Sequence, residues 1–434
     1  MAMKESGIEW VGSIPDTWDV IPNKYIMHKE KNLCEKWTGE DVMSLTMNGV
    51  IVRDLQNPTG KMPATFDGYQ YIEDGDLLMC LFDIDVTPRC IGKVTHNGVT
   101  SPAYSNFKIH DNASRDYYYY YYLMVDNTKE LLHLAKNLRH SFTEEQLGSL
   151  KVPMPPLTEQ QIIADYLDEK CPKIDDIIAE ANASIEEYKK LKQAVIFEAV
   201  TKGLDKNVEM KDSGINWIGN IPINWKWMKI TYILDYKDSY PIGDGDHGII
   251  KTESYCSEGI PYIRVQNIGW GTPLIMDNVV YISEKDNEKI KSSQLKPNDI
   301  LFVKTGGTIG KTAIVPNKIP ISNTTSHVGK ITVSSEHDSK FIFYMLSSFV
   351  GYKQFWDIAC MKATRPELSV SEIKQIRVLV PSSKEEEVEI AHYLDKIVPD
   401  FDSLIAEKES LIKDLESYKK SLIYEAVTGK RRVV

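Results

Sequence analysis

Cysteine and histidine are scarce in this 434-residue chain, and neither is clustered. The six cysteines, at positions 34, 80, 90, 171, 256 and 360, include no CxxC pair, and the nine histidines include no HExxH motif. Zinc sites and disulfide frameworks need such close spacings. We therefore expect no metal centre, and we expect reduced thiols in a cytoplasmic compartment.

Long apolar runs are missing as well. The stretch MAMKESGIEW at the N-terminus lacks the apolar core of a signal peptide, and no run approaches the roughly 20 residues of a membrane span. With 42% hydrophobic and 26% charged residues, the composition is typical of a globular chain long enough for two or more domains. We expect a cytoplasmic protein without a membrane partner.

The sequence also lacks the catalytic motifs that it superficially suggests. The segment 304–312, KTGGTIGKT, departs from the phosphate-loop pattern because Thr305 stands where the pattern needs glycine. The stretch SPAY at 101–104 misses the second proline of the (N/D/S)PPY motif of adenine methyltransferases, and the chain has no FxGxG loop for a methyl donor. These absences predict a non-catalytic chain that holds no cofactor of its own.

What the sequence does contain is an internal repeat. Residues 158–201 align with residues 385–428 at an offset of 227 without a gap, and residues 4–18 align with residues 211–225 at an offset of 207. Such a repeat predicts two equivalent halves related by a pseudo-two-fold axis. On that basis the C-terminus should lie near the N-terminus.

Each copy of the longer repeat has the apolar periodicity of a helix that packs along another helix. We predict that Thr158 and Gln161 form a capping box at the start of the first copy. Pro172 and Pro399 predict a break between a short and a long helix. Lys192 fills one position of the seam, and the apolar seam residues are Ile174, Ile178, Ile185 and Tyr188 in the first copy and Leu404, Leu411, Leu415, Tyr418 and Leu422 in the second.

The net charge of −11 is concentrated in these helical segments. Residues 158–201 have a net charge of −5 and residues 384–428 have a net charge of −6, so the rest of the chain is neutral on balance. The overall charge therefore does not exclude nucleic acid as a partner of the other regions, where local basic patches can neutralise phosphates.

Residues 19–156 and 226–381 read as strand-rich mixed α/β regions that share turn signals but little else. The motif Ile-Gly-Lys ends at Lys93 in the first region and at Lys311 in the second, and we align Arg139 with Arg365. A run of six tyrosines, 117–122, suits either a packed helix or strand or a surface that stacks on bases, and we favour packing because the equivalent segment, FIFYML, is apolar.

Together, the duplicated ESGIEWVGSIP segment, the VPMPPLTEQQIIADYLD junction and the EAVTGK ending resemble the specificity subunit of type I restriction-modification systems over nearly the whole chain. The resemblance implies an α+β fold with two target-recognition domains, separated by two long helices that pack as an antiparallel coiled coil. It implies recognition domains at 1–156 and 204–382 and helical spacers at 157–203 and 383–434.

The same resemblance implies a function without catalysis. Each domain would read one half of a bipartite, asymmetric double-stranded DNA target, and the helices would dock two methyltransferase subunits, with restriction subunits joining the complex. S-adenosylmethionine, ATP and magnesium would then belong to those partners. The alternative that we keep is a symmetric, non-catalytic protein-interaction scaffold.

The candidate DNA-binding residues are basic or hydroxyl side chains in the two variable regions. Arginine pairs with guanine or phosphate, and lysine neutralises phosphate. The candidates are Arg89, Lys93, Tyr104, Arg139, Arg264, Lys304, Thr305, Lys311 and Arg365. Solvated surface charge is the alternative for each of them.

Overall fold

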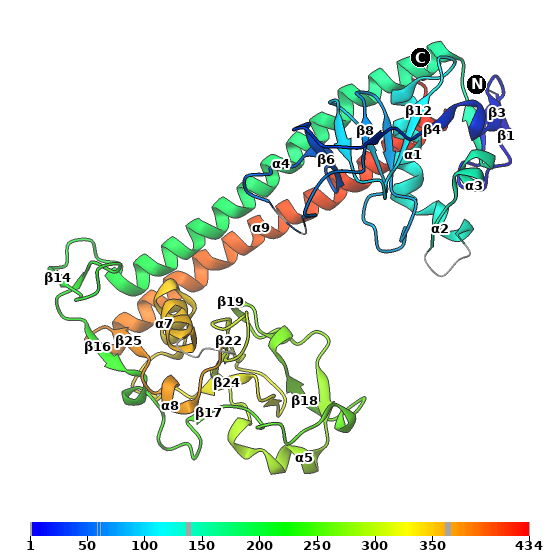
Figure 1. Ribbon diagram of the computed structural model, residues 1–434. Helices are drawn as coiled ribbons and strands as arrows, with labels where there is room; N and C mark the ends of the chain where they lie inside the picture. The colour runs from blue at the N-terminus through cyan, green and yellow to red at the C-terminus, as the bar shows by residue number, and fades with distance from the viewer. Residues whose placement is uncertain (1, 59, 61, 136–139, 361–365, 434) are drawn as a thin grey trace. The chain divides into compact units, whose positions relative to one another are not determined.

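A computed structural model describes residues 2–58, 60, 62–135, 140–360 and 366–433. The chain divides into a first unit, residues 1–182 with 409–434, and a second unit, residues 183–408 (Figure 1). Both units mix helices with sheets, so the predicted α+β class is confirmed. Among the described residues, no helix has the length and apolarity to cross a membrane. Because the two units divide each long helix between them, the domain boundaries inferred from the sequence stay a prediction.

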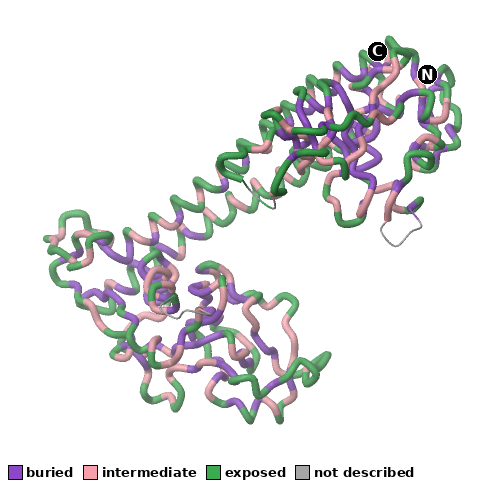
Figure 2. Tube along the Cα trace, in the orientation of Figure 1, coloured by how far each residue is buried: buried purple, intermediate pink, exposed green. Residues whose placement is uncertain are grey.

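Two long helices, α4 (Leu157–Lys202) and α9 (Lys384–Val427), contribute to both units. They run antiparallel in each unit. In the first unit the Lys419 ammonium lies 2.6 Å from Asp175, and in the second the Lys192 ammonium lies 2.6 Å from Asp402. Figure 2 shows buried positions recurring along both helices with exposed positions between them. The predicted antiparallel pairing is thus confirmed within each unit.

The predicted breaks at the prolines are wrong, because Pro172 lies inside the continuous helix α4 and Pro399 inside α9. An internal proline removes one backbone hydrogen bond and costs about 3 kcal/mol. Packing offsets this cost, since Cys171 and Ile174 on either side of Pro172 are buried. The predicted capping box is also wrong: α4 begins one residue before Thr158.

The predicted seam of α9 is shifted by one residue at three of its five positions. Leu404, Leu411 and Tyr418 are 40%, 39% and 49% exposed, so they do not lie in the helix interface and their assignment as seam residues is wrong. The neighbouring residues Ile405 and Ile412 are partly buried instead. Of the other predicted seam residues, Ile174, Ile185 and Leu422 are buried, and Ile178, Tyr188 and Leu415 are partly buried.

The first unit builds two main sheets beside the helices. A four-stranded sheet has the order β10 (Ile91–Lys93), β9 (Leu77–Met79), β12 (Ser105–Ile109) and β4 (Met27–Glu30), and a five-stranded sheet has the order β5 (Leu33–Cys34), β8 (Tyr69–Ile72), β11 (Gly98–Thr100), β6 (Val42–Thr46) and β7 (Gly49–Val52). Two small pairs join β1 (Met3–Glu5) to β2 (Ser13–Pro15) and β3 (Asp19–Pro22) to β13 (Lys151–Met154), and the helices are α1 (Arg115–Thr128), α2 (Glu130–Leu134) and α3 (Glu144–Ser149).

The second unit repeats this plan with different sheet sizes. Its five-stranded sheet has the order β17 (Ile242–Gly243), β24 (Val328–Ile331), β21 (Ile300–Val303), β22 (Thr312–Ile314) and β19 (Trp270–Pro273), and its three-stranded sheet has the order β20 (Val280–Ile282), β18 (Ile260–Ile263) and β23 (Asn323–Thr324). The small pairs are β14 (Met210–Asp212) with β15 (Asn220–Pro222) and β16 (Lys226–Lys229) with β25 (Arg377–Val380), and the helices are α5 (Glu284–Lys289), α6 (Ser339–Ser347), α7 (Phe349–Cys360) and α8 (Val370–Ile373).

The tyrosine run forms the middle of α1, and it packs inside the first unit. Five of its six side chains are buried, which excludes base stacking for them. The Tyr117 hydroxyl donates to the Val427 carbonyl at 2.7 Å, and the Tyr120 hydroxyl donates to the Asp168 carboxylate at 2.7 Å. The apolar helix α6 holds the equivalent place in the second unit, where the Tyr344 hydroxyl donates to Asp395 at 2.9 Å.

The chain termini meet in the first unit, as the repeat predicts. The Lys430 ammonium donates to the Val11 carbonyl at 2.7 Å. Gly429 has a φ of +71°, and a Cβ atom there would lie 2.5 Å from the Pro15 ring. Glycine is required at this position both for the left-handed backbone and for the close approach.

The hairpin register overturns one predicted equivalence. The segment Gly75-Asp76-Leu77-Leu78 aligns with Asn298-Asp299-Ile300-Leu301, so Leu77 corresponds to Ile300. Lys93 pairs with Leu77 on β9, whereas Ile314 pairs with Ile300 on β21. Lys93 therefore corresponds to Ile314, three residues beyond Lys311. The shared Ile-Gly-Lys motif is coincidental, and the two lysines do not occupy the same place in the two units.

Candidate nucleic-acid interface

The clearest cationic and aromatic surface of the second unit forms around Lys311 and Trp270. The register between β19 and β22 shifts at Trp270, which starts the edge strand β19. Such irregularities redirect side chains. Trp270 is 49% exposed, and the Lys311 ammonium lies 5.9 Å from its ring centroid. Among the described residues Lys311 forms no ion pair, so its charge is free for a ligand.

Helix α7 extends this surface. Tyr352 meets Trp270 edge to face at 5.7 Å between ring centroids, and Trp356 stacks on Tyr352 at 6.4 Å with an interplanar angle of 15°. Gly310 has a φ of +89°, and a Cβ atom there would lie 2.9 Å from the Tyr352 ring. The glycine thus brings the turn before Lys311 against the aromatic side chains.

Two other predicted residues hold this turn in place rather than face outward. Lys304 is buried, with its ammonium 3.7 Å from Glu367 and 3.9 Å from Asp244. Thr305 is also buried, and its hydroxyl lies 2.9 Å from the His327 ring nitrogen Nδ1. The structure therefore brings Lys304, Thr305 and Lys311 together, but of the three only Lys311 presents an unpaired side chain.

In the first unit, Arg89 and Lys93 are occupied by partners within the chain. Arg89 donates to the carbonyls of Ile91 and Met47 at 3.0 and 2.9 Å and to the Tyr119 hydroxyl at 2.8 Å. Lys93 pairs with Asp116 at 2.7 Å. Both line a hollow of about 670 Å³ beside the long helices, but their donors are largely satisfied before any ligand arrives.

The remaining predicted residues lie elsewhere. Tyr104 is partly buried, and burial raises its pKa above the ordinary value. Arg264 donates to the Asn278 carbonyl at 3.3 Å, while its buried Nε has no partner among the described residues. Arg139 and Arg365 lie outside the described residues.

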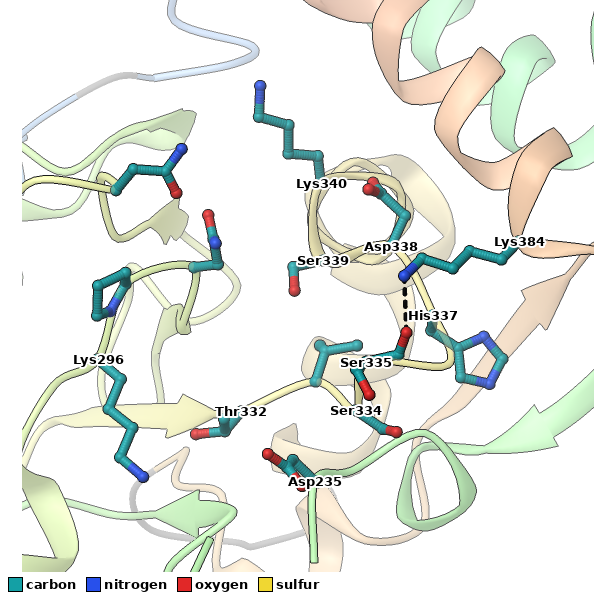
Figure 3. Close-up of a pocket in the computed structure, with 14 residues that line it drawn as sticks. Asp235, Lys296, Thr332, Ser334, Ser335, His337, Asp338, Ser339, Lys340 and Lys384 are labelled. Atoms are coloured by element: carbon teal, nitrogen blue, oxygen red, sulfur yellow. Dashed lines mark hydrogen bonds between the residues drawn. The ribbon is translucent and has the colours of Figure 1, made fainter. Parts of the chain in front are cut away.

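A polar hollow of about 650 Å³ lies in the second unit, near the starts of α6 and α9, and Figure 3 shows the side chains that line it. Its lysines all have partners in the chain. Lys384 donates to the Ser335 carbonyl at 2.7 Å, Lys296 pairs with Asp238 at 2.8 Å, and Lys340 pairs with Asp395. This hollow fastens the first turn of α9 to the domain and offers no unpaired cation from its lysines.

Sequence reasoning missed the aromatic part of the interface. Trp270 lies in a short NIGWGTP segment, and a tryptophan between two glycines was the signal available in the sequence. Tyr352 and Trp356 could not be found this way, because only the packing of α7 brings them to the strand edge. Within the described part of the chain, no cluster of three or more His, Cys, Asp or Glu side chains could hold a metal ion.

Comparison with known proteins gives a family match. Residues 81–187 and 222–414, more than half of the chain, match the family model described as "Type I restriction modification DNA specificity domain". The specificity subunit of the type I restriction enzyme MjaVIII from Methanocaldococcus jannaschii is 27% identical over 289 residues, which cover 66% of this chain and 63% of that protein. The EcoBI specificity subunit from Escherichia coli is 28% identical over 286 residues, which cover 64% and 58%. The matches span less than two thirds of each relative's length.

A solved structure shares the fold over nearly its full length. A chain from work on complex assembly and conformational transition of the type I R-M system superposes with a TM-score of 0.68 at 13% identity, covering 96% of this chain and 99% of the other. The likeness shows a common fold.

Proposed function

Because the chain belongs to the type I restriction-modification DNA specificity family, we propose that it is the DNA-reading subunit of a type I restriction-modification complex. It selects a bipartite, asymmetric duplex target and carries out no chemistry itself. Adenine methylation takes place on its methyltransferase partners, which hold S-adenosylmethionine, and cleavage takes place on restriction partners, which use ATP and magnesium.

The observation that carries this proposal is the contrast between a shared scaffold and unlike surfaces. The two units pair their small strands and cap their central helices in the same way. Their surfaces differ, because the pairing of Lys311 with the Trp270 ring is found in the second unit only among the described residues. By hairpin register, the first unit has Cys90 where the second has Lys311. Two readers with different surfaces recognise two different half-sites, so the target has no palindromic symmetry.

Exposed apolar side chains on the long helices support two docked partner subunits. Ile177 and Leu404 are equivalent by the 227-residue repeat, and both are exposed. Leu191 and Tyr418 are likewise equivalent and exposed. Repeated apolar positions on the helix surface suit two copies of one partner, which we assign to methyltransferase subunits.

The test is to exchange residues 226–381 for the corresponding domain of another family member and to sequence the methylome of a host that expresses the exchanged chain with its methyltransferase. We expect one half of the methylated motif to change while the other half is kept. A host without the chain is the control, and it should show no methylation of the motif. If both halves change, or if the motif persists without the chain, the proposed function fails. A complex that binds DNA without salt dependence would favour the scaffold alternative.

A further inference from the structure

Strands β16 and β25 form a two-stranded sheet in the second unit (Figure 1), and they carry exposed lysine and arginine side chains. Lys229 and Arg377 are direct cross-strand partners, and Lys226 begins the same strand. Together with Trp227, Met228 and Tyr232 these residues line a shallow hollow of about 460 Å³, which we call the cationic hollow. No acidic residue lines it, and among the described residues none of its three cations forms an ion pair.

Lys229 and Arg377 place two like charges opposite each other. This arrangement is unfavourable for the sheet, and the fold does not need it. Directly opposite residues of an antiparallel pair have Cβ atoms about 4.5–5.5 Å apart, and like charges there destabilise the sheet. Lys229 and Arg377 are both exposed at this spacing. Beside them, Tyr232 is 72% exposed and Trp227 is partly exposed. Unpaired cations in an exposed hollow suit an anionic ligand, because lysine and arginine form charge-assisted hydrogen bonds with phosphate oxygens.

The first unit does not repeat this surface. There, β3 pairs with β13 so that Pro22 is opposite Lys151, in the places of Lys229 and Arg377. Asp19 takes the place of Lys226, following the shared tryptophan. Three positive charges in the second unit thus correspond to one positive and one negative charge in the first, where Lys24 adds one further cation over the Tyr25 ring.

We propose that the cationic hollow binds the phosphate backbone of duplex DNA beside the half-site that the second unit reads. This proposal rests on the proposed function. A partner present in two copies would meet the same residues in both units, whereas the hollow exists in one unit alone. The target DNA is the asymmetric polyanion that the complex holds once. Contacts of this kind position a protein on DNA and add affinity without reading bases.

The test uses the chain assembled with its methyltransferase partner. Affinity for a fluorescent duplex is measured over a range of salt concentrations with two duplexes: one extends two helical turns beyond the second half-site, and one ends at its edge. The variant carries Lys229→Gln and Arg377→Gln. On the extended duplex, the slope of log affinity against log salt should fall by about 1.8, because each lost phosphate contact contributes about 0.9. On the short duplex the slope should not change, and the methylated motif should stay the same.

The matched control removes two other exposed lysines of the same unit, through Lys251→Gln and Lys318→Gln, and neither has an ion pair with a residue that the structure describes. Its slope should equal that of the wild type. The thermal midpoint of the Lys229→Gln, Arg377→Gln variant should equal or exceed that of the wild type, because the change removes a repulsive pair. Site-specific binding with an unchanged slope overturns this proposal alone. Loss of the methyltransferase subunit from the variant complex would assign the hollow to an acidic protein surface and would also overturn it. A wild-type complex without any site-specific binding overturns the proposed function as well.

Discussion

The indole Nε1 of Trp18 donates a hydrogen bond to a carboxylate oxygen of Glu159 at 2.7 Å, and Trp225 makes the equivalent bond to Glu386 at 2.9 Å. Each tryptophan thereby ties the strands that follow it to the first turn of a long helix. Gly429, just past the end of the other helix, closes the same joint, since a Cβ atom there would lie 3.0 Å from the Trp18 ring. In the second unit a Cβ atom on Gly203 would lie 3.3 Å from the Trp225 ring, so the joint fixes three chain segments at one place in each unit.

Replacing Trp18 with phenylalanine should weaken this joint markedly. The change removes a hydrogen bond to a carboxylate in a partly buried site, and such bonds contribute about 1.5–3 kcal/mol. We expect the free energy of unfolding of the first unit to fall by about 2 kcal/mol or more, as measured by chemical denaturation. Trp10→Phe in the same unit is the control, because the partly buried Trp10 indole donates only a longer bond, 3.3 Å, to the neutral Tyr121 hydroxyl. Equal losses in the two variants would contradict the role assigned to the Trp18–Glu159 bond.

The two ion pairs between the long helices should differ in strength. Lys192 has a side-chain exposure of 8% beside Asp402, whereas Lys419 has 23% beside Asp175, and the two pairs are equivalent by the 227-residue repeat. Removing a carboxylate strands a buried lysine at higher cost than an exposed one. We expect Asp402→Ala to lower the free energy of unfolding by about 2 kcal/mol and Asp175→Ala by less than about 1 kcal/mol.

A double change tests whether the cost comes from the stranded charge. Lys192→Met combined with Asp402→Leu replaces the pair with apolar side chains, and it should restore most of the stability that Asp402→Ala loses. Glu169→Ala, which removes an exposed pair with Lys173, serves as the control with almost no effect. If the double variant is as unstable as Asp402→Ala, the charge of Lys192 is not the cause.

The tyrosine helix α1 should make the first unit sensitive to alkali. Burial raises the pKa of Tyr117, Tyr118 and Tyr122 above the usual value of about 10, and the same holds for two more tyrosines of the run. Each hydroxyl has a higher pKa in the folded chain than in the unfolded chain. Its neutral form therefore contributes its full stability below about pH 10, and this contribution is lost as the pH rises toward the pKa of the folded state. The second unit has one tyrosine in the equivalent run, Tyr344, and should be less sensitive.

Two substitutions separate the tyrosines by their bonding. The buried Tyr122 hydroxyl has no hydrogen-bond partner among the described residues, so Tyr122→Phe should stabilise the first unit by about 1 kcal/mol at neutral pH and raise the midpoint of the alkaline transition. Tyr117→Phe loses the bond to the Val427 carbonyl and should cost about 1 kcal/mol. Circular dichroism during a pH titration measures both, and the exposed Tyr25→Phe should change neither. A Tyr122→Phe variant less stable than Tyr117→Phe would refute this distinction.

The repeat allowed much of the fold to be predicted, because equivalent positions had to agree. The two helices and the proximity of the chain ends follow from the repeat, and the strand-rich character of residues 19–156 and 226–381 follows from turn signals. The phase of the α9 seam did not follow, since Leu404 precedes Ile405 and each could face the partner helix. Only the packed structure decides between two adjacent apolar residues.

The candidate site was harder to predict for a different reason. Arg89 and Lys93 have the residue types that bind DNA, but the fold places a hydroxyl, two carbonyls and a carboxylate beside them. Whether a cation is free depends on neighbours distant in sequence. Lys311 and Lys93 both lie over an aromatic ring, Trp270 and Tyr119, but among the described residues only Lys93 has a carboxylate partner. From the sequence alone, both lysines are equally good candidates for DNA binding, and only the tertiary contacts distinguish them.

Lys93→Ala and Lys311→Ala should therefore have opposite consequences in the assembled complex. Lys93→Ala leaves Asp116 without its close partner, so it should lower the stability of the first unit by about 1 kcal/mol and leave affinity for the target duplex nearly unchanged. Lys311→Ala should leave stability within about 0.5 kcal/mol of the wild type and weaken DNA binding, with a salt slope reduced by about 0.9. Denaturation curves and salt-dependent titrations on the same preparations measure both quantities. If Lys93→Ala weakens binding as much as Lys311→Ala does while the complex stays equally stable, then the ion pair with Asp116 opens on DNA, and the interface extends to Lys93.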